Sequence, residues 1–354
     1  MPHPATIRAE ADRLARAFEA AGAEPVEVDV LQPAETLLDL YGEDIRSRAY
    51  VTRDPHRGEM MLRPDFTVPV TLRHLANGAD EARYSYVGAV FRVQELGSDR
   101  ASEYLQAGYE RFGGDDPAVA DAEVFGLFAR LLAPLGLRAA TGDMGLVTAA
   151  IEGLSTTPAR KAALLRHRWR PRRFRALLDR FAGRSEPKPR PAPAPGDAPE
   201  IGLRTAADVA DRHAFFTADA ATPPLSAVEM ELLDDLLSIR ETAPNALSHL
   251  RDLAVDMSAI QGAVDRLARR FDALDAGGQP VDALEFEPNF GRTTLEYYDG
   301  FVFGFTIAGR RDLPPVATGG RYDALTRVLS GGREVPAVGG VIRPALVADQ
   351  EAAA

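Results

Sequence analysis

Two groups of strand-like segments enclose one long helical stretch, and this order limits the chain to few architectures. Helix-forming residues dominate from about Leu146 to about Leu274. Alternating or β-branched runs typical of strands lie on both sides of that stretch, at residues 25–30, 49–52, 59–62, 83–87, 89–93, 103–112, 137–141, 281–286, 293–298 and 301–307. Strands interrupted by a helical insertion predict an α+β fold with an antiparallel sheet flanked by helices.

The same patterns divide the chain into segments. Residues 1–145 and 276–347 are expected to form two parts of one core, residues 146–275 the helical insertion, and residues 348–354 a tail. A run of alternating prolines at residues 186–199 predicts a solvated connector inside the insertion. Apolar spacing predicts further helices that end near Gly22, pass through Leu37, Leu38 and Leu40, and cover residues 67–75, 118–132 and 322–329. Residues 54–58 carry turn residues that predict a hairpin between the runs at 49–52 and 59–62.

Composition narrows the class of protein. With 45% hydrophobic residues, 26% charged residues and no membrane-length apolar run, the chain is expected to be a cytoplasmic globular protein that needs no membrane. A net charge of −11 argues against broad nucleic-acid binding. The absence of cysteine excludes thiolate chemistry, and the six histidines show no metal-ligand spacing, so neither a metal nor a cofactor is expected.

Several short motifs follow one another along the chain in a characteristic order. They are Leu62-Arg63-Pro64-Asp65-Phe66-Thr67, residues 84–92, Gln106-Ala107-Gly108-Tyr109-Glu110, Leu295-Glu296-Tyr297-Tyr298, Thr318-Gly319-Gly320-Arg321-Tyr322-Asp323 and Val335-Pro336-Ala337-Val338-Gly339. Their order resembles the catalytic domain of class II histidyl-tRNA synthetases, over residues 33–342. The resemblance implies a class II aminoacyl-tRNA synthetase-like sheet and a pocket for histidine.

The chemistry of these residues suits that ligand. Histidine carries an ammonium, a carboxylate and an imidazole, which carboxylates, hydroxyls and amides can bind. Gln106 and Glu110 lie four residues apart in an extended run, so they share a face of the strand. Alternatively, the tyrosines are core aromatics and Glu110 is a surface charge. The candidate histidine-binding residues are Asp65, Thr67, Arg92, Gln106, Glu110, Tyr297, Tyr298 and Tyr322.

Most of the cations that such a site needs for ATP chemistry are missing. Adenylation develops negative charge on phosphates, which positioned arginines stabilise. Arg92 resembles the family's α-phosphate arginine, but Ser102, Thr293 and Leu346 stand where three other arginines are expected. Pro344 is expected to disturb the last helix. We therefore predict no catalytic residues and no adenylation activity.

A synthetase-like chain without these arginines resembles the regulatory subunit of ATP phosphoribosyltransferase. Seven residues follow Val347, so we expect no anticodon-binding domain, which takes about 100 residues. The resemblance implies a short-form catalytic subunit as partner, L-histidine as ligand, and a homodimer within a hetero-oligomer. Such a subunit supports the first step of histidine biosynthesis and its feedback regulation.

Two alternatives remain open at this point. A minimal histidyl-tRNA synthetase could use relocated cations, for which Arg292 and Arg343 are the nearby candidates. An RNA- or tRNA-binding module could use the basic run at residues 166–175. One short run is a weak sign of RNA binding, so we favour a solvated or partner-docking helix with Trp169 and Phe174 packed inward. Asp143 has no recognisable partner in the sequence and receives no role.

Overall fold

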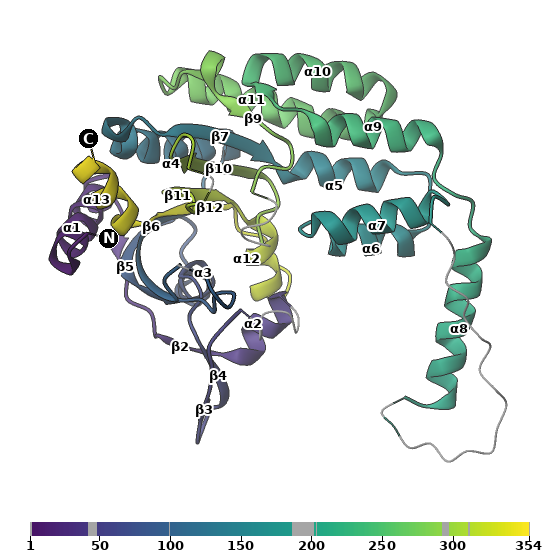
Figure 1. Ribbon diagram of the computed structural model, residues 1–354, viewed down its shortest axis with the longest axis horizontal. Helices are drawn as coiled ribbons and strands as arrows, with labels where there is room; N and C mark the ends of the chain where they lie inside the picture. Colours follow the sequence, from purple (N-terminus) through teal and green to yellow (C-terminus); the bar gives the residue numbers. More distant parts are fainter. Residues whose placement is uncertain are drawn as a thin grey trace.

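A nine-stranded sheet forms the centre of the computed structural model, which describes residues 2–41, 48–98, 100–185, 202, 204–291, 297–310 and 312–353. Its strands lie in the order β1-β5-β6-β12-β11-β10-β7-β9-β8 (Figure 1). Their bounds are β1 Glu24–Pro25, β5 Ala82–Phe91, β6 Glu103–Phe112, β7 Arg138–Asp143, β8 Glu241–Thr242, β9 Glu285–Phe286, β10 Phe301–Thr306, β11 Ala317–Arg321 and β12 Ala337–Ile342. The pairs β1–β5 and β7–β9 are parallel and the other neighbouring pairs antiparallel, which confirms the α+β prediction.

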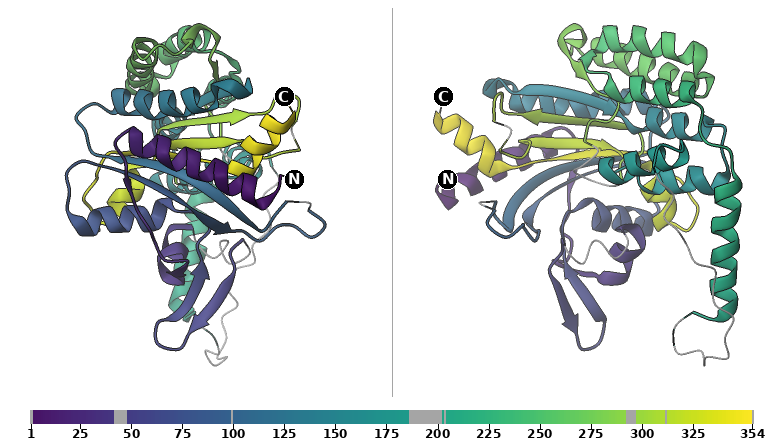
Figure 2. Two further views of the ribbon diagram at one scale, coloured as in Figure 1. Left: turned by 90° about the vertical axis from the view of Figure 1, so that its left-hand side faces the viewer. Right: turned by 45° about the vertical axis from the view of Figure 1, so that its right-hand side comes forward.

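Helices cover the two faces of this sheet unequally. On one face lie α1 (Pro4–Ala20), α4 (Pro117–Leu132) and α13 (Pro344–Ala353), and α1 packs beside α13 (Figure 2). The ring of Phe18 on α1 lies 5.7 Å from Tyr109 of β6 and 5.6 Å from Phe128 of α4. The opposite face carries the side chain of Glu110, with α3 (Thr67–Asn77) and α12 (Asp323–Leu329) packed against each other nearby.

A smaller three-stranded sheet lies beside the main one. It consists of β2 (Leu31–Pro33), β4 (Gly58–Leu62) and β3 (Val51–Asp54), and α2 (Ala34–Tyr41) follows β2. The β3–β4 hairpin turns where Asp54 accepts hydrogen bonds from the backbone N–H groups of His56 and Arg57 at 2.8 and 2.9 Å. The predicted hairpin is therefore confirmed.

The helical stretch between the two groups of strands is confirmed, and it also supplies one strand. It contains α5 (Met144–Gly153), α6 (Pro158–Arg166), α7 (Pro171–Phe181), α8 (Ala206–Ala221), α9 (Ala227–Ser238), α10 (Ala243–Asp256) and α11 (Gln261–Ala276). Figure 1 shows α8 projecting away from the body of the molecule. Between α9 and α10 the chain forms β8, which pairs with β9 at the edge of the sheet. The Pro-rich segment lies outside the described residues.

Some predicted strands were wrong in extent. Residues 26–30 form no strand, because β1 ends at Pro25 and the carbonyl of Val28 accepts a 2.6 Å hydrogen bond from the Arg63 guanidinium. Residues 281–283 form a 3₁₀ turn, which the N–H of Ala283 closes on the carbonyl of Pro280, and only β9 follows. The runs at 83–87 and 89–93 are parts of one strand, β5, which ends at Phe91.

The end of the chain also differs from expectation. Pro344 is the first residue of α13 and does not disturb it, because the first turn of a helix leaves the missing N–H of proline without consequence. The residues expected to form a tail instead continue α13 as far as Ala353.

Candidate functional site

A buried carboxylate, Glu110, is the centre of the polar cluster on the inner face of the sheet. Its side chain is 1% exposed, so the alternative that Glu110 is a surface charge is wrong. Oε1 accepts hydrogen bonds from the Thr67 hydroxyl and from the Tyr86 hydroxyl, both at 2.9 Å. Oε2 accepts one from the Tyr322 hydroxyl at 2.7 Å. The Tyr297 hydroxyl extends the cluster by donating to Thr67 Oγ1 at 3.2 Å.

Four different elements bring these groups together. Thr67 begins α3, Glu110 lies on β6, Tyr86 on β5, and Tyr322 joins β11 to α12. The strand register places Tyr86 opposite Gly108, two residues before Glu110, so Tyr86 reaches the same carboxylate. Tyr86 was not among the residues predicted from the sequence. The signal was present, since Tyr86 lies in the 84–92 motif, but only the register shows where it points.

Glycines make room for this cluster on the sheet. A Cβ atom at Gly339 would lie 1.6 Å from Oε2 of Glu110, and one at Gly108 would lie 2.2 Å from Cζ of Tyr86. Such distances are far below van der Waals contact, so any other residue would force the carboxylate or the ring to move. The glycines of the two motifs are thus explained by close approach of side chains to the backbone.

Gln106 lies on the same strand as Glu110, and the polar groups of its side chain stay unmatched. Its side chain is 0% exposed, and neither Oε1 nor Nε2 has a hydrogen-bond partner among the described residues. Strand alternation puts it on the same face as Glu110, about 13 Å away along the backbone. A buried amide without partners costs roughly 1–3 kcal/mol. Such an amide fits a ligand that supplies both a donor and an acceptor.

Burial sets the protonation of Glu110. It raises the pKa of Glu110 to about 7, against the opposing hydrogen bonds from Tyr322, Thr67 and Tyr86, and the charge of Asp65 raises it further. Burial also raises the pKa values of Tyr86 and Tyr322 well above 10.0, so both hydroxyls remain protonated donors at neutral pH.

Replacing Glu110 with glutamine should flatten the dependence of stability on pH. A folded-state pKa near 7 against an unfolded value of 4.5 means that the folded state binds more protons between these values. Stability from this group is therefore complete below pH 4.5 and falls by about 3 kcal/mol as pH rises through 7. In urea unfolding from pH 4.5 to 8, the slope of the unfolding free energy against pH should be shallower for Glu110→Gln than for the wild type.

Asp299 explains why that slope should not vanish. Burial raises its pKa to about 7, so it acts in the same direction as Glu110. Glu103→Gln, on the exposed end of the same strand, is the matched control and should keep the wild-type slope. A slope that is equal in Glu110→Gln and the wild type would contradict the assignment of this carboxyl.

The remaining candidates lie close to this cluster without bonding to Glu110. Asp65 is 5% exposed, and its Oδ1 accepts from the N–H of Val68 at 3.4 Å. Arg92 donates from Nε to the carbonyl of Pro64 at 2.9 Å. Tyr298 is buried, and its ring lies 4.9 Å from that of Tyr297. Burial raises the pKa of Tyr298, and the charge of Arg92 opposes the change.

The positions expected to have lost their arginines differ in what now occupies them. The carbonyl of Ser102 accepts from the N–H of Arg92 at 2.8 Å. Leu346 packs against the hydrophobic core from α13. Thr293 and Arg292 lie outside the described residues. Ser102 and Leu346 therefore carry no positive charge at the two described positions where arginines are expected.

Arg343 is the described arginine closest in sequence to Leu346. Its side chain is 8% exposed and donates to the carbonyl of Pro315 at 2.5 Å. Burial lowers its pKa, opposed by Tyr104, while the charge of Arg92 adds to the lowering. Arg343 is therefore a second charge near Arg92, held by an internal hydrogen bond.

The aromatic residues of the basic run point into the protein. Trp169 is 7% exposed and Phe174 is 1% exposed, which confirms the expectation that both pack inward. Neither ring is available to stack on a nucleic-acid base, so only the positive charge of the run still favours an RNA-binding patch.

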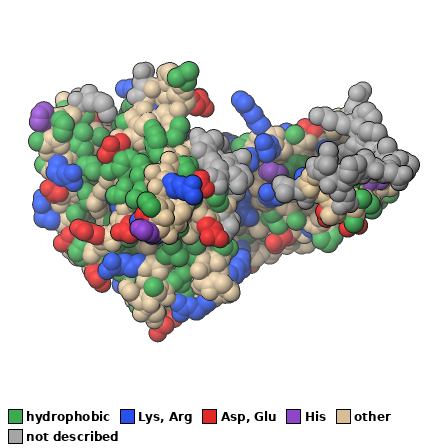
Figure 3. Space-filling model, turned by 90° about the horizontal axis from the view of Figure 1, so that it is seen from below, with side chains coloured by type: hydrophobic (Ala, Val, Ile, Leu, Met, Phe, Trp, Pro, Cys, Tyr) green, Lys and Arg blue, Asp and Glu red, His purple; other side chains and the backbone are tan. Residues whose placement is uncertain are grey.

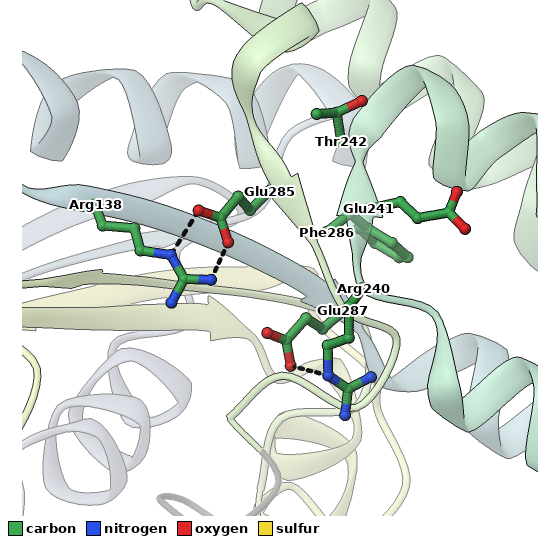
Figure 4. Close-up of a pocket in the computed structure, with 7 residues that line it drawn as sticks. All are labelled: Arg138, Arg240, Glu241, Thr242, Glu285, Phe286 and Glu287. Carbon is green, nitrogen blue, oxygen red and sulfur yellow. Dashed lines mark hydrogen bonds and ion pairs between the residues drawn. The ribbon is translucent and has the colours of Figure 1, made fainter. Parts of the chain in front are cut away.

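A separate cavity of about 610 Å³ lies where β8 and β9 meet the start of β7 (Figure 4). Its charged groups are already paired: Arg138 with Glu285, and Arg240 with Glu287 at 2.8 Å. Glu241 lies 3.1 Å from Nδ1 of His249. A ligand would have to displace these ion pairs, so we assign no function to this cavity.

The described residues contain neither a candidate metal site nor a helix that could cross a membrane. No group of three or more His, Cys, Asp or Glu side chains there could hold a metal ion. In the same residues, no helix has both the length and the apolar character to cross a membrane.

Known proteins resemble this chain over most of its length. The family described as histidyl-tRNA synthetase matches residues 2–188 and 202–345. Proteins named ATP phosphoribosyltransferase regulatory subunit from Brucella canis and Brucella suis are 32% identical over 344 residues, covering 90% of this chain and 90% of theirs.

Solved structures show the same fold at lower identity. One is described as an ATP phosphoribosyltransferase regulatory subunit/histidyl-tRNA synthetase from Bacillus halodurans, with TM-score 0.71, 21% identity and coverage of 98% of this chain and 79% of that one. The histidyl-tRNA synthetase from Nostoc has TM-score 0.65, 17% identity and coverage of 98% and 72%. The chain belongs to the family of ATP phosphoribosyltransferase regulatory subunits, which is built on the histidyl-tRNA synthetase fold.

Proposed function

We propose that this chain is a non-catalytic regulatory subunit that binds L-histidine in the Glu110 cluster. In this role it acts with the short-form catalytic subunit of ATP phosphoribosyltransferase, at the first step of histidine biosynthesis. The observation that carries the proposal is the contrast between two regions. The amino-acid side of the site keeps a buried polar cluster around Glu110, while the phosphate side has Ser102 and Leu346 in place of arginines.

The cluster has capacity left for a ligand. An ionised carboxylate offers about four lone-pair sites, and three hydroxyls occupy three of those on Glu110. One acceptor site on Oε2 is left for an N–H of the ligand. Gln106 adds an acceptor and two donors that no described residue uses. A ligand with polar groups at both ends, such as histidine, can engage Glu110 and Gln106 together.

Glu110→Ala should weaken histidine binding by roughly 1.5–3 kcal/mol, the usual cost of losing a hydrogen bond to a charged group. Isothermal titration calorimetry with L-histidine measures this directly. Glu103→Ala on the same strand is exposed and should bind as the wild type does. If the complex binds histidine equally well after Glu110→Ala, the regulatory site lies elsewhere, most simply at the subunit interface.

A homodimer is the expected building block, formed through Gln32-Pro33 and the strand and helix that flank them. Exposed apolar residues gather near β3: Tyr50 is 39% exposed, Val51 44% and Val93 38%. The N–H of Val93 bonds to the carbonyl of Arg48, which keeps these residues close together. Figure 3 shows hydrophobic side chains on the side of the body where Figure 1 places β3. A second copy would cover this surface.

Reconstitution tests the proposed function. The short catalytic subunit is mixed with this chain and assayed for phosphoribosyl-ATP formation, with and without histidine. We expect a gain in activity, inhibition by histidine and co-elution of the two chains. Tenfold inhibition needs about 1.4 kcal/mol of coupling. If the catalytic subunit gains neither activity nor histidine sensitivity, and the chains elute apart, the proposal is wrong.

A minimal histidyl-tRNA synthetase is the second candidate, and one observation favours it. The charge of Arg92 lowers the pKa of Arg343, so two arginines lie near each other on the phosphate side. The pyrophosphate exchange assay described in the Discussion separates this candidate from the first.

A further inference from the structure

A buried ionic network joins the helical insertion to the core. Arg270 of α11 donates from Nε to Oδ2 of Asp121 on α4 at 2.7 Å. Its NH1 donates to Oδ2 of Asp143, at the end of β7, at 2.6 Å. Arg270 is 5% exposed and Asp121 is 0% exposed. The sequence offered no partner for Asp143, but the fold supplies one from a helix more than a hundred residues away.

The same aspartate holds a second arginine from the other side. Arg321 of β11 donates from Nε to Oδ1 of Asp121 at 2.9 Å and from NH1 to Oδ1 of Asp323 at 3.0 Å. Its NH2 also donates to the carbonyl of Pro117 at 3.0 Å. Asp121 thus bridges two guanidinium groups, one from the insertion and one from the central sheet.

Arg321 is adjacent to the cluster around Glu110. The next residue, Tyr322, donates its hydroxyl to Glu110 at 2.7 Å. The carbonyl of Arg321 accepts from the N–H of Asp299 at 3.0 Å. The Asp299 carboxylate then accepts from the N–H groups of Asp323 and Ala324 at 3.1 and 2.6 Å. Tyr322 is therefore fixed by its neighbours on both sides.

Stability alone is a weak reason for such a network. Burying two guanidiniums and the carboxylates of Asp121 and Asp143 costs several kcal/mol per ion, and apolar residues of the same volume often stabilise a fold as well or better. Ion pairs differ from apolar contacts because their geometry is directional. Contiguous networks of hydrogen bonds and ion pairs are one of the routes that can couple two distant sites.

We propose that the chain Arg270–Asp121–Arg321 couples the helical insertion to the histidine pocket, with these residues acting as positioning residues for Tyr322. A partner that displaces α11 on binding the insertion would pass that displacement through the ion pairs to the hydroxyl that binds Glu110. This inference rests on the proposed function, because it names the route by which the partner alters histidine affinity.

The test compares histidine affinity with and without the catalytic subunit. Calorimetry on the wild-type chain, alone and in the complex, should give dissociation constants that differ by about fivefold or more. Arg270→Lys keeps the positive charge, but a lysine ammonium cannot bond to Asp121 and Asp143 with the geometry of a guanidinium. The ratio of the two dissociation constants should therefore fall towards one. Arg269→Lys, exposed on the same helix, should keep the wild-type ratio. A merely structural role would reduce the amount of folded protein without changing this ratio.

Hydrogen exchange on the wild-type complex gives a reading that needs no variant. Histidine should slow amide exchange in α11 around Arg270 as well as in α12. Histidine binding with unchanged exchange in α11, or an unchanged affinity ratio in Arg270→Lys, would overturn the coupling and leave the pocket intact. Absence of histidine binding by the wild type, alone and in the complex, would instead overturn the proposed pocket.

Discussion

Histidine-dependent exchange of pyrophosphate into ATP should stay at the background rate with the purified chain. Ser102 and Leu346 supply no positive charge on the phosphate side, and Thr293 is uncharged as well. Loss of a single arginine that stabilises a transferring phosphoryl group can cost about 10³–10⁵ in rate. Loss of several removes most of the electrostatic stabilisation on which adenylation depends.

An authentic histidyl-tRNA synthetase in the same assay is the positive control. Exchange well above background by this chain would contradict the regulatory assignment. If that exchange then disappeared in Arg343→Lys, the minimal synthetase with relocated cations would be the correct interpretation. Background exchange together with histidine binding would separate ligand recognition from catalysis.

Asp121→Asn should destabilise the fold by about 3–5 kcal/mol, the typical cost of breaking a buried ion pair. The substitution keeps the shape of the side chain but leaves Arg270 and Arg321 without the charge that lies 2.7 Å from each. Urea unfolding followed by circular dichroism measures the free energy of unfolding.

Asp272→Asn is the matched control, since Asp272 is an exposed carboxylate on α11. Surface substitutions of this kind usually change stability by no more than about 0.5 kcal/mol. A loss below about 1 kcal/mol in Asp121→Asn would mean that Asp143 and Asp323 compensate both arginines without Asp121. The coupling route would then lose its central residue.

The candidate pocket was predictable in parts. Thr67, Glu110, Tyr297 and Tyr322 were selected from their motifs, and the fold joins all four by hydrogen bonds. Tyr86 was missed because its role depends on register: it reaches Glu110 only because β5 and β6 place it opposite Gly108. Asp65, Arg92 and Tyr298 lie nearby but make no hydrogen bond to that carboxylate among the bonds described.

By itself, the sequence determined the local structure and the type of chemistry. Helix periodicity, turn residues and motif order act over a few residues, so they are readable in one dimension and predicted α3, α4 and the β3–β4 hairpin. Only the tertiary structure decided the pairing of charges. Asp121 and Arg270 are 149 residues apart, and their contact exists because α11 packs on α4. Burial likewise depends on the whole fold, which encloses Glu110 and raises the pKa of its carboxyl to about 7.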